Sequence, residues 1–367
     1  MVTSSEWLIS LCYLVLSTSV RNPLIGRRIR EIGLNLHSLD QLFASIAARK
    51  DTSQGAFLHA ISNLENLRSL SLCCHSLDRA SPPGTKTLRF IPLFLTNVSS
   101  NLTSLSLRFP AALFSSMAGG DAPSFPDLRL ETLRISITNG YDKRNQSCPP
   151  DQLVALIGKT VLTVKSLGFY CWDSEFNISD FLSSLGNMRL PHLEKFGLGC
   201  LAPGSRMPGA SNLNRFLLAH NSTLTELSLS HGLLAVHYKE FYEWYRGCFR
   251  SVPLNQTLRK LQLTVLHPVY AMTPPHLSIL GSIYSSLESL SLLTSSLSLY
   301  DVEMLLQSFT CDQLKSLKLH VQRLDTKLLE LLKERCPKLQ ELVLKVNDYR
   351  EPMSRRVSCD SYHVIMA

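Results

Sequence analysis

The sequence lacks the short motifs that accompany most enzyme chemistry. Its 367 residues contain no H-E-x-x-H, G-x-S-x-G or G-x-G-x-x-G pattern. A G-x4-G spacing occurs at Gly204 and Gly209, but Ala210 and Ser211 follow where a phosphate-binding loop needs Lys and then Ser or Thr. The eleven histidines are scattered along the chain. We therefore predict a protein that is not an enzyme and that uses no metal or other cofactor.

Paired cysteines are missing as well. The ten cysteines are spread thinly, and no two have the C-x-x-C spacing of a metal or redox site. Disulfide scaffolds are dense in short secreted chains, whereas this chain is long and its ten cysteines are spread over most of it. The pattern favours thiols that act as small buried apolar groups in a reducing compartment.

No apolar run is long enough to span a membrane. The longest candidate, Trp7–Val20, falls short of the roughly 20 residues of a transmembrane helix, and it has neither the basic start nor the A-x-A site of a signal peptide. Its apolar residues recur at helical spacing, so we predict a capping helix within residues 1–28. A signal peptide is the alternative, and it is favoured by six N-x-S/T sequons, at Asn97, Asn101, Asn145, Asn177, Asn221 and Asn255. In a chain rich in Ser and Thr such sequons also arise by chance.

Blocks of basic residues with interleaved aromatics are absent, although the formal net charge is +8 and the pI is near 9.0. Aromatic residues make up only 8% of the chain, and the longest basic run is Arg27–Arg30. A diffuse positive charge of this kind indicates a solvated, slightly basic surface and does not favour a nucleic-acid partner.

The sequence does contain one short pattern, L-x-x-L-x-L, that returns along most of its length. Leu287–Leu292 is the clearest copy. Eleven copies begin 25 to 38 residues apart, at Ile29, Leu67, Leu102, Leu130, Val164, Leu193, Leu224, Leu258, Leu287, Leu314 and Leu339. A short strand with apolar residues at alternate positions can bury them only by stacking on the strand of a neighbouring copy. The irregular spacing indicates insertions in the connecting segments.

Amphipathic stretches lie between the copies. Apolar residues three and four apart predict helices over Leu39–Ala48, Asp151–Lys159, Ile178–Leu185, Leu213–Ala219, Val302–Ser308 and Leu324–Lys333. Parallel strands need such crossovers, which are right-handed in nearly all proteins. The predicted fold class is α/β: a right-handed solenoid, or horseshoe, of about eleven strand–helix repeats over residues 29–346, with a parallel sheet on its concave face. Residues 347–367 are predicted to form a tail or partial cap.

The concave face is predicted from the repeat itself. Period-two alternation places repeat positions three, five and seven on this face, and Ser, Gly and Thr fill about half of them. The larger or charged side chains among them are the candidate partner-binding residues, namely Arg108, Arg134, Tyr170, Lys195, Lys260, Lys318, His320 and Lys345. A few Trp, Tyr and Arg anchors usually supply most of the binding energy. A partner would therefore gain much of its affinity from loops and edges, unless the face accepts a bulky segment such as the chain's own tail.

One further candidate lies in the aromatic stretch Tyr238–Phe249. Tyr238, Phe241, Tyr242 and Tyr245 share one face of a helix, which is the geometry of a core. Trp244 falls at the margin of this stripe. Ordinary burial is the prediction for Trp244, and the alternative is that it is the best single candidate for an exposed anchor that binds a partner.

With the repeats laid out, the chain resembles leucine-rich-repeat proteins. Leu193–Leu198, preceded by Pro191-His192, and Leu339–Leu344, preceded by Cys336-Pro337-Lys338, look like the long repeats of F-box-associated and ribonuclease-inhibitor-like intracellular families. The segment Arg21–Ile32 is similar to the lead-in of fungal F-box leucine-rich-repeat proteins. The F-box itself has no room before the first repeat, so we expect either an F-box encoded upstream or a repeat-only relative.

The resemblance implies a non-enzymatic scaffold for protein–protein interaction. It further implies the substrate-recognition part of an F-box-type ubiquitin ligase system, acting as a monomer on protein partners in the cytoplasm or nucleus. The alternative is a secreted or cell-surface leucine-rich-repeat binding protein, which the sequons and the apolar start favour.

Overall fold

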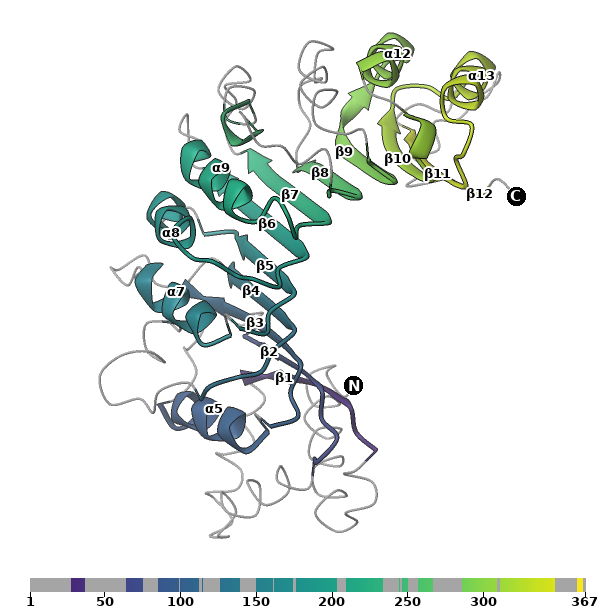
Figure 1. The fold of residues 1–367 in the computed structure, drawn as a ribbon. Coiled ribbons are helices and arrows are strands. Elements are labelled where there is room, and N and C mark those ends of the chain that lie inside the picture. The colour runs from purple at the N-terminus through teal and green to yellow at the C-terminus, as the bar shows by residue number, and fades with distance from the viewer. Residues whose placement is uncertain are drawn as a thin grey trace, which may run out of the picture. The chain divides into compact units, whose positions relative to one another are not determined.

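The fold is drawn in Figure 1 from a computed structural model. The structure describes residues 28–36, 64–74, 85–98, 100–111, 114, 126–138, 150–160, 162–173, 176–202, 209–233, 244, 246–249, 257–266, 286–308, 311–346 and 362–365. The chain divides into two compact units, Met1–Asn177 (unit 1) and Ile178–Ala367 (unit 2). The predicted capping helix at the N-terminus and the predicted helix Leu39–Ala48 lie outside the described residues.

The described elements alternate between strands and helices in both units. Unit 1 contains β1 (Glu31–Asn35), β2 (Ser69–Cys73), α5 (Thr85–Val98), β3 (Ser104–Pro110), β4 (Thr132–Thr138), α7 (Pro150–Gly158) and β5 (Ser166–Cys171). Unit 2 contains α8 (Ile178–Leu185), β6 (Lys195–Ala202), α9 (Ala210–Ala219), β7 (Glu226–Leu233), β8 (Lys260–Leu266), β9 (Ser289–Leu297), α12 (Leu299–Ser308), β10 (Ser316–Val321), α13 (Thr326–Arg335), β11 (Glu341–Val346) and β12 (Tyr362–Ile365).

The strands follow one another in the sheet in sequence order, from β1 to β5 within unit 1 and from β6 to β12 within unit 2. The pairs from β1 to β5 in unit 1 and from β6 to β11 in unit 2 are parallel, and β12 pairs antiparallel with β11. Each of the first eleven strands begins two residues after the first apolar residue of its predicted repeat. Equal repeat positions are paired, as in Leu70 with Leu105 and Leu227 with Leu261. The predicted fold class, α/β with parallel strand–helix repeats, is confirmed.

The core consists of the three apolar positions of each repeat. In the copy that begins at Leu67, Leu67, Leu70 and Leu72 are at most 1% exposed. The exceptions lie in the first and last copies, where Ile29, Ile32 and Leu339 are partly exposed because each copy has a neighbouring repeat on one side only. Burying one such leucine side chain contributes about 1.5–3 kcal/mol, so the recurring leucines are the main source of stability.

Backbone hydrogen bonds fix the repeats in register just before each strand. The carbonyl of Arg30 accepts from the amides of Arg68 and Ser69 at 2.8 and 3.0 Å. In unit 2 the carbonyl of Glu194 accepts in the same way from Thr225 and Glu226 at 2.8 and 3.0 Å. One carbonyl thus accepts from two successive amides of the next repeat. Both of these N–H groups are therefore hydrogen-bonded where the chain enters the strand.

Five of the six predicted helices are confirmed as α7, α8, α9, α12 and α13, with ends within three residues of the predicted ones. Ser298 and Asp301 cap α12 reciprocally: the Asp301 amide donates to Ser298 Oγ at 3.2 Å, and the Ser298 amide donates to Asp301 Oδ2 at 2.8 Å. Helix α5 was not predicted. It contains Pro92, which in sequence indicates a helix break.

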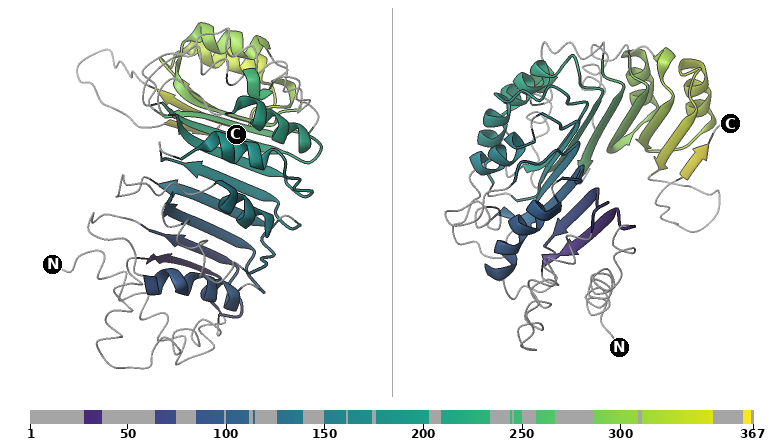
Figure 2. Two further views of the ribbon diagram at one scale, coloured as in Figure 1. Left: turned by 90° about the vertical axis from the view of Figure 1, so that its left-hand side faces the viewer. Right: turned by 60° about the horizontal axis from the view of Figure 1, so that its bottom comes forward.

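Within each unit the described helices lie on one face of the sheet, and none of them lies on the other face (Figure 2). The repeat leucines face the helices. In unit 2, for example, the ring of Phe196 on β6 lies 4.6 Å from that of Phe216 on α9, centroid to centroid. The face without helices is called the open face below. Among the described residues, no helix has the length and apolar character needed to cross a membrane.

Candidate functional site

The open face consists of the repeat positions that point away from the helices. In unit 1 the small side chains Ser71, Ser106 and Ser136 are half-buried there, and in unit 2 Ser228 and Ser230 are. Such side chains leave the hydroxyl groups accessible and allow another backbone to approach the sheet closely. Five of the nine predicted partner-binding residues, Arg108, Arg134, Lys195, Lys260 and Lys345, are exposed on this face, and Tyr170 and Lys318 are half-buried on it.

Three of these predicted residues come together in unit 1. Register pairs Arg108 with Ser136 and Ser136 with Tyr170, so Arg108 on β3 and Tyr170 on β5 lie on one rung of the sheet. Arg134 on β4 lies one rung away, and its guanidinium carbon is 4.6 Å from the centre of the Tyr170 ring, which is a cation–π contact.

Gly168 on β5 makes this contact possible. It is the register partner of Arg134. A Cβ atom at Gly168 would lie 3.0 Å from Cε2 of Tyr170 and 3.5 Å from Cγ of Arg134. The tyrosine ring and the arginine stem thus use the space that any larger residue would occupy. Arg108, Arg134, Gly168 and Tyr170 are called the arginine–tyrosine cluster below.

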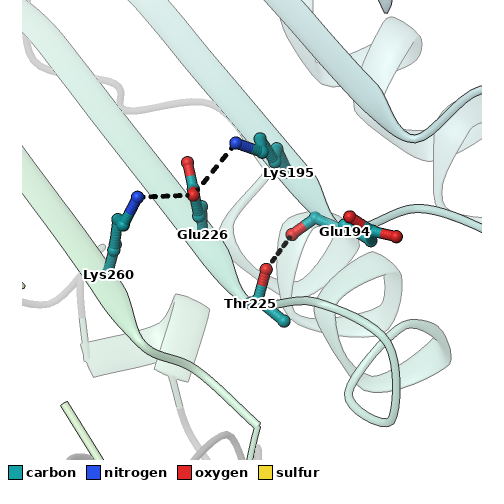
Figure 3. A network of polar contacts seen from close by, with 5 residues as sticks. All are labelled: Glu194, Lys195, Thr225, Glu226 and Lys260. Atoms are coloured by element: carbon teal, nitrogen blue, oxygen red, sulfur yellow. Dashed lines mark hydrogen bonds and ion pairs between the residues drawn. The ribbon is translucent and has the colours of Figure 1, made fainter. Parts of the chain in front are cut away.

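In unit 2 three of the four predicted open-face lysines are paired with carboxylates. Glu226 on β7 accepts from both neighbouring strands, with Lys195 Nζ on β6 at 3.0 Å and Lys260 Nζ on β8 at 2.9 Å (Figure 3). Below them the hydroxyl of Thr225 donates to the carbonyl of Glu194 at 3.1 Å. The three charged residues hold the same repeat position in successive repeats, and their side chains carry a net charge of only +1.

The protonation of this group follows from its contacts. Partial burial of Glu226 favours the neutral acid, but the hydrogen bonds from Lys260 and Lys195 outweigh burial and lower the pKa of its carboxyl group. The hydrogen bond from Glu226 in turn raises the pKa of Lys260. Both partners are therefore charged at neutral pH.

A second ion pair lies further along unit 2. Lys318 Nζ on β10 is 3.1 Å from Glu341 Oε1 on β11, and Glu341 Oε2 also accepts from Ser316 Oγ at 2.6 Å. Lys345 is exposed at the far end of β11. Of the four predicted lysines, three are thus held by a glutamate.

The prediction that His320 is accessible on the open face is wrong, because His320 is only 6% exposed. The pairing of β9 with β10 shifts register between Leu319 and Val321, where the partners on β9 change from Leu292 to Leu297. The extra residues of β9 lie beside this rung of the sheet, which accounts for the burial.

The prediction that Trp244 is buried is confirmed, and the alternative, an exposed anchor, is wrong. Trp244 is 3% exposed, and its ring packs edge-on against His231 with 4.4 Å between centroids. Nδ1 of His231 lies 3.1 Å from Sγ of Cys200. Burial lowers the pKa of His231 to about 3, so its imidazole is neutral at physiological pH.

A second buried histidine also serves the core. His220, at the end of α9, accepts from the Leu190 amide through Nε2 at 2.9 Å. Its Nδ1 therefore carries the proton and donates to the Phe216 carbonyl at 2.7 Å. Burial lowers the pKa of His220 as well, despite this backbone hydrogen bond. Both histidines are packing residues that need the neutral form.

The cysteines agree with the prediction that they pack in the core. The seven described cysteines carry thiols rather than disulfides, and all but Cys73 are buried. Cys311 and Cys336, which hold the same place before successive repeats, are 5% and 3% exposed. In the part of the chain that the structure describes, no group of three or more His, Cys, Asp or Glu residues is placed to hold a metal ion.

Sequence reasoning missed the pairing partners on the open face. Glu226 was not singled out, although aligning the repeats places it between Lys195 and Lys260 at one repeat position. Gly168 was counted only as a small residue, and its steric role depends on the rotamer of Tyr170. Repeat alignment could have found the ion pairs, whereas the glycine contact required side-chain coordinates.

Comparison of the chain with protein-family models gives no match. Comparison with curated proteins gives no significant relative.

Proposed function

We propose that this protein is a non-enzymatic scaffold that binds another protein through the open face of its sheet. The observation that supports the proposal most is the asymmetry of the sheet. One face is covered by helices, and the other presents half-buried serines together with arginine, lysine and tyrosine side chains. Small side chains give a partner close access to the sheet, and arginine and tyrosine are the residue types that most often anchor interfaces.

A steric scan of both faces tests this proposal. Tryptophan at Ser106 on β3 or Ser228 on β7 would project a bulky ring from the open face. Tryptophan at Ala155 on α7 or Ala219 on α9, both exposed, would do the same from the helical face. Tagged variants are expressed in the native cells, and the proteins that co-purify with each are quantified by mass spectrometry.

We expect the Ser106→Trp and Ser228→Trp variants to lose at least one specific partner by about tenfold, which corresponds to about 1.4 kcal/mol. The Ala155→Trp and Ala219→Trp variants should retain it within about twofold. Loss of the partner from the helical-face variants alone, or equally from all four, would refute binding through the open face.

We further propose that the scaffold acts in the cytoplasm or nucleus as the substrate-recognition part of an F-box-type ubiquitin ligase. Support comes from the resemblance of its repeats to that family and from the thiol state of the described cysteines, which suits a reducing compartment. If this is correct, deleting the gene will lengthen the half-life of the captured partner in a cycloheximide chase. An unchanged half-life would remove the ligase role and leave the binding role intact.

The secreted alternative keeps specific support in the sequons. Asn101 and Asn177 are exposed, so both would be accessible to a glycosyltransferase. Treatment of the native protein with an N-glycosidase separates the two locations. An intracellular protein will keep its gel mobility, whereas a shift toward lower mass would establish secretion.

A further inference from the structure

The arginine–tyrosine cluster contains two positive charges that no carboxylate among the described residues balances. Neither Arg108 nor Arg134 forms an ion pair with any residue that the structure describes. On β2 to β5 the other open-face residues are Ser, Thr, Gly, Cys, Tyr and Pro, and among the described strand residues of unit 1 the one carboxylate on this face is Glu31, at the start of β1. In unit 2, by contrast, Glu226 pairs with Lys195 and Lys260 and Glu341 pairs with Lys318 on the same face, whereas Lys345 is exposed.

The cluster is also arranged before any ligand arrives. Stacking on Tyr170 holds the planar guanidinium of Arg134 against the sheet, and Gly168 leaves the space in which the ring lies. A stacked guanidinium keeps its N–H edge available for hydrogen bonds. Arg134 therefore loses less side-chain entropy on binding an anion than a lysine with a flexible side chain would lose.

We propose that the arginine–tyrosine cluster is the docking site for an acidic, extended segment of the protein partner, recognised through its Asp or Glu side chains. Arginine forks match carboxylates in two parallel hydrogen bonds. Arg108 and Arg134 lie on adjacent strands one rung apart, so they can bind two carboxylates of one extended chain. The serine hydroxyls of β3 and β4 flank them, and these small side chains let the peptide backbone approach.

This inference rests on the proposed function, because it names the chemistry of the partner that the open face binds. The charge is what selects the ligand. Arg108 and Arg134 have no carboxylate of their own to displace, whereas a ligand at Lys195 or Lys260 would have to compete with Glu226 at 3.0 and 2.9 Å. Acidic segments should thus prefer unit 1 even though both units carry cations.

The test uses the full chain and a fluorescein-labelled hexaglutamate peptide, with binding followed by fluorescence anisotropy. Arg108→Gln/Arg134→Gln removes two positive charges from the cluster. The matched control, Lys195→Gln/Lys260→Gln, removes two positive charges from the open face of unit 2. Hexaglutamine of the same length measures binding that does not need charge, and a phosphoserine peptide and a single-stranded oligonucleotide serve as competitors.

We expect the arginine double variant to bind hexaglutamate at least about tenfold more weakly than the native chain, and the lysine double variant to bind within about threefold of it. Tyr170→Leu keeps both charges but loses the stack, and we expect it to weaken binding by a smaller factor, about threefold to tenfold. Arg134→Lys, which keeps the charge without the fork, should behave like Tyr170→Leu. Thermal melts of each variant verify that these substitutions leave the fold intact.

Equal losses for the two double variants would overturn the proposal, because binding would then depend on net charge alone. Stronger displacement by the oligonucleotide than by unlabelled hexaglutamate would overturn it in favour of a nucleic-acid ligand, and stronger displacement by the phosphoserine peptide in favour of a phosphorylated one. If the steric scan still identifies a partner on the open face while hexaglutamate does not bind, the inference fails and the proposed function stands.

Discussion

His231 should make unit 2 less stable in mild acid, by an amount that follows from its environment. The imidazole is fully buried between Cys200 and Trp244, and its pKa in the folded protein is about 3, against 6.5 for an ordinary histidine. Because the folded pKa is depressed, the unfolded chain binds the proton more readily than the folded chain. The stabilisation is complete above pH 6.5 and is lost as the pH falls toward 3.

The magnitude follows from the width of this window. Each pH unit below 6.5 lowers the free energy of unfolding by about 1.4 kcal/mol through His231. Lowering the pH from 7 to 5 crosses about 1.5 such units, so it should lower the free energy of unfolding by about 2 kcal/mol. The carboxyl group of Glu226 has a lowered pKa, so its contribution is lost only at more acidic pH. His220 also has a lowered pKa and acts in the same direction.

The assay is urea unfolding followed by the fluorescence of Trp244, with Trp7 and Trp172 replaced by Phe so that only unit 2 is observed. The comparison is with His231→Gln in the same background, measured at pH 7 and pH 5. The substitution lowers the free energy of unfolding at both pH values. The change between pH 7 and pH 5, however, differs from that of the unsubstituted background only by the titration of His231, because His220 contributes equally to both proteins. Between pH 7 and pH 5, the free energy of unfolding of the protein with His231 should fall by about 2 kcal/mol more than that of the His231→Gln variant. Equal losses would show that His231 is not held neutral in the fold.

Three further predictions concern the elements that carry the open face, and urea unfolding checks each of them. Leu229→Ala on β7 should lower the free energy of unfolding by about 2–5 kcal/mol, because it opens a cavity at a fully buried position. Ser228→Ala, at the neighbouring position on the open face, should change the free energy of unfolding by less than about 0.5 kcal/mol. Similar losses for the two variants would contradict the assigned faces. Ser298→Ala should cost about 0.5–2 kcal/mol because it removes half of the cap of α12, and no change would show that Asp301 suffices alone. Glu226→Gln should cost at most about 1 kcal/mol, because the pairs with Lys195 and Lys260 are partly exposed; a larger loss would mean that this carboxylate holds the strands together.

Much of the fold could be read from the sequence because one short period determines it. The spacing of Leu67, Leu70 and Leu72 places all three in the core of any parallel stack, and the same spacing set the start of every strand up to β11. Helix α5 escaped prediction because the stabilising contacts of its buried residues, such as Phe94, outweigh the local penalty of Pro92.

The candidate site was less predictable, because it depends on contacts between repeats. Arg108, Arg134 and Tyr170 were recognised singly, yet their grouping follows from register and from the absent side chain of Gly168. His320 was misplaced because an irregularity in the neighbouring strand β9, and not its own repeat, decides its exposure. Trp244 lay at the margin of a helical stripe, where periodicity cannot distinguish burial from exposure.

The central claim is that a protein partner contacts the open face, and photo-crosslinking tests it most directly. A benzophenone amino acid is placed at Ser71 or Ser228 on the open face, and at Ala155 or Ala219 on the helical face. We predict that irradiation in the native cells will join the same partner protein to the chain from Ser71 and Ser228 and not from the two alanines. Crosslinks to a partner from Ala155 and Ala219 alone would contradict the claim and place the binding surface on the helices.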